Sequence, residues 1–130
     1  MIATKVIAKI VQDSSGVATE IPVILTDEGV LESVTDYVLS LHLSGTAIST
    51  INKHIQSIIL LIEFLEANKS MFADPEEMFS VFVRRLYSGT VNENGLDPSG
   101  LYWIPASTGT VSRHISHLTN FTNWMADKGR

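Results

Sequence analysis

The sequence predicts a mainly α-helical domain in which four helices follow a short N-terminal β-hairpin. Two runs rich in Val and Ile flank a turn-forming cluster near the N-terminus, and four later stretches repeat apolar residues every three or four positions. The chain has 130 residues, of which 45% are hydrophobic and 18% are charged. These values fit one globular domain with a buried core.

The hairpin is expected at the N-terminus. Residues 4–12 and 17–25 read as two strands on either side of residues 13–16 (DSSG), whose types favour a turn. Pro22 cannot donate a backbone hydrogen bond. We therefore expect the second strand to be an edge strand or to be short.

The first helix is expected to begin at Thr26. The hydroxyl of Thr26 can cap a helix, and the acids at positions 27 and 28 suit the positive end of the helix dipole. The helix should end at Leu43, before Gly45. Its apolar face would be formed by Val30, Val34, Tyr37, Val38 and Leu41.

The second helix is expected from Ser49 to Asn68. The third has the clearest start in the chain, because Asp74 can cap it and Pro75 suits its first turn. It should end at residues 88–89 (SG), since glycine favours helix termination.

A long loop is expected over residues 90–106, which are rich in Asn, Gly and Pro. Residues 102–104 (YWI) should pack this loop against the helices. The fourth helix should start between Thr108 and Thr110 and end at Asp127.

The composition argues against several classes of protein. The chain has no cysteine, which removes disulfide scaffolds, thiol nucleophiles and thiolate zinc sites. Lys5 and Lys9 interrupt the apolar N-terminus, and no cleavage pattern of a signal peptide follows. The longest apolar run, residues 58–62, is far too short to span a bilayer. We expect a soluble cytoplasmic protein with no cofactor and no membrane partner.

The charge of the chain is unevenly distributed. The net charge of −5 disfavours nucleic acid as a partner, but no Asp or Glu occurs in residues 37–62 or 98–126. The acids gather instead in residues 27–36 and 74–77. The two acid-free windows can be a chance result or a surface kept clear for an anionic partner.

Two stretches sixty residues apart have similar sequences. Residues 50–55 read TINKHI and residues 110–115 read TVSRHI. Helical periodicity explains the shared apolar spacing but not the shared hydroxyl, cation and histidine. The match predicts two helix starts with similar hydrogen-bonding chemistry, lying side by side and suited to contact with phosphates.

Residues 110–129 (TVSRHISHLTNFTNWMADKG) resemble the N-terminal core-binding domain of the tyrosine recombinases, the phage-integrase family, and residues 50–65 do so less closely. The resemblance lies in a hydroxyl, a branched apolar residue and a basic residue, followed by Leu, Phe and Trp at helical spacing and a terminal Lys-Gly. It implies a four-helix, SAM-like orthogonal bundle over residues 26–130, after a hairpin over residues 1–25. The catalytic domain of such a recombinase would lie outside this chain.

The resemblance also implies a function. The domain would clamp double-stranded DNA and position it for strand exchange, with neighbouring recombinase protomers as partners in a synaptic complex. The residues expected to contact DNA lie at the starts of the second and fourth helices: Ser49, Thr50, Asn52, Lys53, Gln56, Thr108, Thr110, Ser112, Arg113 and His117. Members of the family are usually basic here, so the acidity of this chain implies a weak grip on DNA.

Other interpretations of these residues stay open. Lys53 and Arg113 can be ordinary solvated charges, and Thr50 and Thr110 can be helix caps. His114 and His117 have the spacing of metal ligands, but no third ligand is apparent and we expect no metal site. His42 and His54 are expected to be half-buried or surface residues. Trp124 lies off the apolar face of its helix, so it should pack on the loop, on the hairpin or on the absent domain.

No enzymatic pattern is found. The catalytic residues of the family lie in its C-terminal domain, and nothing in this chain matches them. Tyr37 and Tyr87 fall at core spacings and Tyr102 lies in the loop, so none is assigned as a nucleophile. We expect a DNA-binding fragment without catalytic activity. The alternative is a helical protein–protein interaction module whose acidic helices meet a basic partner.

Overall fold

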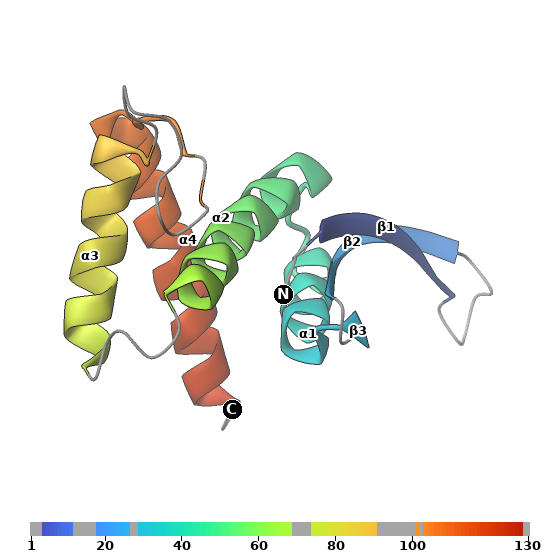
Figure 1. Ribbon diagram of the computed structural model, residues 1–130. Helices are drawn as coiled ribbons and strands as arrows, with labels where there is room; N and C mark the ends of the chain where they lie inside the picture. The colour runs from blue at the N-terminus through green and yellow to red at the C-terminus, as the bar shows by residue number, and fades with distance from the viewer. Residues whose placement is uncertain are drawn as a thin grey trace.

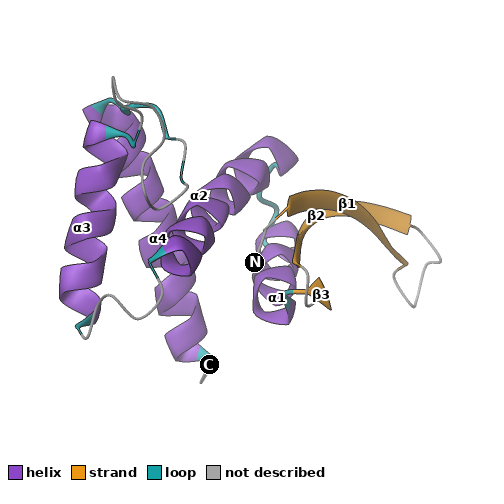
Figure 2. Cartoon of the chain, viewed as in Figure 1, coloured by secondary structure: helices purple, strands orange, loops and turns teal. Residues whose placement is uncertain are grey.

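The chain forms a three-stranded sheet at one end and four helices beyond it (Figure 1). The computed structural model describes residues 4–11, 18–26, 29–68, 74–90, 101 and 103–128. The described elements are β1 (Thr4–Val11), β2 (Ala18–Thr26), β3 (Gly29–Val30), α1 (Glu32–Leu43), α2 (Ile48–Ala67), α3 (Pro75–Ser88) and α4 (Thr108–Asp127). The predicted fold class, a mainly helical domain after a hairpin, is confirmed (Figure 2).

The sheet has the order β1-β2-β3, and both pairings are antiparallel. β2 runs through Pro22, which pairs with Ile7 of β1, so the proline does not shorten the strand. Among the described strands, β3 pairs only with Leu25 and Thr26. On the side away from β1, Pro22 therefore has no partner strand among the described residues, and an edge of this kind is where sheets tolerate proline. The expected turn at residues 13–16 lies outside the described residues.

The first helix begins later than the sequence predicts. Thr26 is the last residue of β2, and its hydroxyl donates to the carbonyl of Gly29 at 3.1 Å instead of capping a helix. Gly29 has a φ of 108°, which lets the chain reverse so that Val30 pairs with Leu25. α1 therefore starts at Glu32, which is the acid in its first turn, whereas residues 27 and 28 lie outside the described part.

The predicted bounds of the other helices are confirmed. Asp74 accepts a hydrogen bond from the Glu76 N–H at 3.1 Å, and Pro75 is the first residue of α3. Gly89 ends α3 with a φ of 70°. α2 and α4 likewise match their predicted ranges to within about one residue, the usual precision of helix ends.

The core is aromatic at the α2–α3 contact. Phe64, Phe82 and Trp103 pack together with ring centroids 5.4 to 6.2 Å apart, which confirms that Trp103 fixes the loop onto the helices. Ile104 is 75% exposed and Tyr87 is 42% exposed, so the expectation that they pack inward is wrong. Tyr102 lies outside the described residues.

The sheet packs on the helices through β2. Ile21 and Ile24 are fully buried, and β2 contacts both α1 and α2. In Figure 1 the hairpin extends away from α3 and α4, so it is held by its base. None of the helices in the described part is long and apolar enough to cross a membrane.

Candidate nucleic-acid interface

The two helices that carry the sequence repeat, α2 and α4, cross each other. In Figure 1 both run downward through the crossing, and their N-terminal ends lie apart at the upper side of the view. The prediction that the two helix starts lie side by side is therefore wrong. What the structure brings together is the second and third turns of both helices, residues 54–57 of α2 and residues 114–117 of α4.

The centre of the crossing is a chain of polar side chains. The Ser57 hydroxyl lies 2.7 Å from Nδ1 of His114 and 2.9 Å from Nδ1 of His117. The rings of His54 and His117 stack with centroids 4.0 Å apart. The Tyr37 hydroxyl of α1 lies 3.2 Å from Nδ1 of His54 and completes the chain. We call these five residues the polar crossing.

The polar crossing follows the repeat in a reciprocal way. His54 and His114 are sixty residues apart, as are Ser57 and His117. His54 stacks on His117, and Ser57 bonds His114, so each member of one matched pair contacts the opposite member of the other. The repeat thus produces a local two-fold relation in the contacts, much as a self-complementary interface does between two subunits.

The histidines of the repeat face inward. His54 and His114 are 8% and 7% exposed, and Ser57 is fully buried. The prediction that these two histidines add hydrogen-bonding chemistry to an outer surface is therefore wrong, and His54 is neither half-buried nor on the surface. Ser57 was the one indication of this buried polar cluster in the sequence, because it places a hydroxyl on an otherwise apolar face of α2 that also carries His54.

Burial sets the protonation of the cluster. Desolvation, and after it the charge of the neighbouring His117, lower the pKa of His54 to about 4. Desolvation, then Arg113 and then His117 lower the pKa of His114. Desolvation and Arg113 also lower the pKa of His117, which a hydrogen bond to the Lys53 backbone partly opposes. All three imidazoles are therefore neutral at neutral pH.

The residues predicted to contact DNA are all accessible, but to different degrees. Seven are exposed, and they are Ser49, Thr50, Lys53, Gln56, Thr108, Ser112 and Arg113. Asn52, Thr110 and His117 are half-buried. The exposed set occupies the N-terminal halves of α2 and α4.

Two cations from different helices lie near His117. Both Lys53 of α2 and Arg113 of α4 are close enough to His117 to lower its pKa by charge repulsion. Neither cation has a carboxylate partner among the residues that the structure describes. The result is a small positive surface over the polar crossing, with Gln56 one turn beyond Lys53 on α2.

The predicted hydroxyls have distinct roles at the helix ends. Ser107, not Thr108 or Thr110, caps α4, since its Oγ accepts from the Thr110 N–H at 3.3 Å. Thr110 Oγ1 in turn accepts from the Ser107 hydroxyl. α2 begins after Ala47 without a side-chain cap, so Thr50 does not act as one. The first backbone N–H groups of α2 therefore stay free to attract an anion, as at other uncapped helix N-termini.

Trp124 packs on α1. Its ring lies 5.4 Å from that of Tyr37 in α1, with Phe121 on the same side at 5.1 Å from Tyr37. Tyr37 is 3% exposed and confirms its predicted place in the core. Trp124 is half-buried against α1, a neighbour that the sequence did not indicate.

Within the described residues, no group of three or more His, Asp or Glu side chains is arranged to hold a metal ion. Comparisons with protein-family models, with curated proteins and with solved structures found no match. The site must therefore be interpreted from its own geometry.

Proposed function

We propose that this chain is a helical domain that binds duplex DNA, with the N-terminal halves of α2 and α4 against the phosphates. The observation that carries the proposal is that two exposed cations, Lys53 of α2 and Arg113 of α4, lie near His117 where the two helices cross. Phosphate contacts supply much of the affinity of such domains, and unpaired cations are the groups that make them.

The acid-free windows of the sequence support this interpretation. Residues 48–62 of α2 and residues 108–126 of α4 contain no Asp or Glu, although the chain carries a net charge of −5. Glu63 and Glu66 lie in the last turns of α2, away from its positive end. A phosphate approaching the crossing from the N-terminal ends would meet cations, hydroxyls and helix dipoles of favourable sign.

Some side chains on this surface can read bases as well as phosphates. Asn52 and Gln56 carry amides, which pair well with adenine, and Arg113 can pair with guanine. The two helix starts lie apart, so they would contact separate phosphate groups and not one shared site. The small number of cations implies weak binding, with a dissociation constant of about 10⁻⁴ to 10⁻⁶ M as for non-specific contacts.

In the wider architecture we propose the role that the recombinase resemblance implies. The domain would position double-stranded DNA for strand exchange by a separate catalytic domain, and neighbouring protomers would be its protein partners. Its task would be binding and orientation, since the residues of the surface are suited to holding phosphate.

The test is a double charge reversal with a matched control. Lys53→Glu with Arg113→Glu should abolish the binding of a short duplex, measured by fluorescence anisotropy at low salt. Arg84→Glu with Lys128→Glu reverses two other exposed cations and changes the net charge equally. This control should lose far less affinity, and circular dichroism should show unchanged helix in both variants. Equal losses in the two variants, or binding that survives the first, would contradict the proposal.

A specific observation also favours the alternative function, a protein–protein interaction module. A groove of about 390 Å³ lies between α1, α2 and α4, and it is lined mostly by apolar side chains that include Ile62, Leu65 and Met125. Leu65 is 42% exposed there. If this groove carries the function, Leu65→Glu should remove concentration-dependent association in sedimentation experiments, while the double charge reversal should change nothing.

A further inference from the structure

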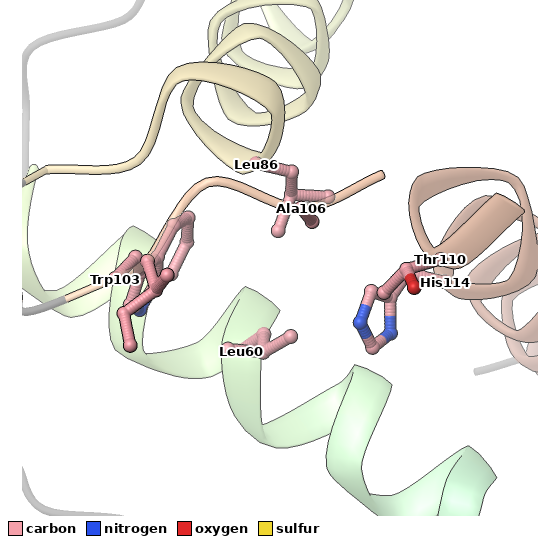
Figure 3. Close-up of a pocket in the computed structure, with 7 residues that line it drawn as sticks. Leu60, Leu86, Trp103, Ala106, Thr110 and His114 are labelled. Atoms are coloured by element: carbon pink, nitrogen blue, oxygen red, sulfur yellow. The ribbon is translucent and has the colours of Figure 1, made fainter. Parts of the chain in front are cut away.

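A second hollow lies on the other side of the α2–α4 crossing. It has a volume of about 320 Å³ and lies between α2, α3 and the segment that leads into α4 (Figure 3). Its lining residues are Leu60, Leu86, Trp103, Ile104, Ala106, Thr110 and His114. Five of these seven are apolar, as is usual in pockets for small molecules.

The two polar lining residues lie together on one wall. Thr110 and His114 are one turn apart on α4, and Figure 3 shows the threonine hydroxyl beside the imidazole, with Trp103 across the hollow. No lining residue carries an acidic or permanently charged side chain. The hollow therefore has one polar corner and an apolar remainder.

The hydrogen bonds of the polar corner determine what it can offer. A serine hydroxyl has one proton, and that of Ser57 is donated to the Lys53 carbonyl at 3.2 Å. The His114 tautomer that fits this donation carries its proton on Nδ1 and donates it to Ser57 Oγ, and in this tautomer Nε2 of His114 is an acceptor. This nitrogen has no hydrogen-bond partner among the described residues.

Thr110 offers the opposite hydrogen-bonding group, a donor. Its Oγ1 accepts from the Ser107 hydroxyl at 3.1 Å, so its own proton is available for donation. The corner thus presents one donor and one acceptor next to each other. A ligand group that satisfies both must donate and accept at a single atom, as a hydroxyl does.

We propose that this hollow binds a small aromatic alcohol of the phenol class. The hydroxyl of the ligand would donate to His114 Nε2 and accept from Thr110, and its ring would lie among Leu60, Leu86 and Trp103. A cavity of about 150 Å³ holds benzene in another protein, so about twice that volume suits a fused two-ring phenol. The proposal does not rest on DNA binding, although Thr110 belongs to both sites.

The experiment uses 2-naphthol as the probe and the two tryptophan indole N–H signals in NMR spectra as reporters. Trp103 lines the hollow, whereas Trp124 packs on Tyr37 and serves as an internal reference. A Trp124→Phe variant assigns the two signals. 2-Naphthol should shift the Trp103 signal saturably and leave the Trp124 signal in place.

Matched ligands and variants complete the test. 2-Methoxynaphthalene cannot donate, so it should bind about tenfold more weakly, and Thr110→Val should weaken 2-naphthol by about threefold to tenfold. Ala106→Phe fills the hollow and should abolish binding, whereas the same change at the exposed Ala126 should not. The proposal is overturned if the Trp103 signal does not move, if the methoxy compound binds equally well, or if Ala106→Phe binds like the unaltered protein.

Discussion

The imidazole of His54 stacks on that of His117, with ring centroids 4.0 Å apart and an angle of 28° between the ring planes. One ring belongs to α2 and the other to α4, so the stack joins the two helices at their crossing. Two stacked imidazoles tolerate each other only while at least one is neutral, because like charges at this distance repel strongly. The fold at this point therefore depends on deprotonated histidine.

We predict that the protein loses stability in mild acid. The folded state lowers the pKa of His54 to about 4, whereas the unfolded chain keeps the usual value of 6.5. Between these values the unfolded state binds more protons, so the stabilisation is complete above pH 6.5 and is lost as the pH falls toward 4. After allowance for solvent screening, His54 alone should account for about 2 kcal/mol.

Urea unfolding at a series of pH values measures this loss. His54→Gln keeps a hydrogen-bonding partner for Tyr37 but cannot titrate, so it should flatten the pH dependence. His42→Gln, in the last turn of α1, removes a histidine outside the polar crossing and is the matched control. If the His54→Gln protein lost stability equally steeply as the pH falls, the stack of His54 on His117 would not be the source of the loss.

Removing the hydroxyl at the centre of the crossing should be costly. Ser57→Ala leaves Nδ1 of both His114 and His117 without their partner in a buried setting. We expect a loss of about 1 to 3 kcal/mol in the free energy of unfolding, the usual cost of an unsatisfied buried polar group. Ser116→Ala, on the exposed face of α4, should change stability by less than about 0.5 kcal/mol. Similar values for the two variants would mean that Ser57 does not hold the histidines.

Two glycines should respond oppositely to the same substitution. Gly89 has a φ of 70°, and an added Cβ would lie 2.7 Å from both the Trp103 carbonyl oxygen and Pro105 Cδ. We expect Gly89→Ala to cost more than about 2 kcal/mol and to loosen Trp103. Gly109 lies in the first turn of α4 with open space around it, so Gly109→Ala should be neutral or stabilising by about 0.5 kcal/mol. Thermal unfolding with tryptophan fluorescence measures both, and a tolerated Gly89→Ala would contradict the close approach.

The sequence predicts best those features that depend on neighbouring residues. The start of α3 follows from Asp74 and Pro75, because capping and proline geometry act within one helical turn. The start of α1 could not be predicted in this way, because the pairing of Val30 with Leu25 keeps the chain in the sheet. That pairing competes with the capping potential of Thr26, and nothing in the local composition decides between them.

For the candidate site, the sequence predicts which side chains are exposed but not which of them contact each other. Helical periodicity places Lys53 and Arg113 on outer faces, and both are exposed. It cannot show that residues sixty positions apart contact each other, and so it missed the polar crossing through Ser57. The inward histidines and the separated helix starts both follow from the crossing of α2 and α4, which is a tertiary relation.

A gain of function should separate site-specific phosphate contact from the effect of net charge. Gln56 is exposed one turn beyond Lys53, so Gln56→Lys would extend the positive surface along α2. If this surface lies on phosphates, the logarithm of the binding constant should fall more steeply with the logarithm of salt concentration, by about 0.9 for one added contact. Asn123→Lys adds the same charge at an exposed position in the C-terminal half of α4 and should leave the slope nearly unchanged. Anisotropy titrations of a short duplex at several salt concentrations give both slopes. Equal slopes for the two variants would show that the affinity for the duplex depends only on the overall charge of the protein. The surface at the crossing would then not be the DNA interface.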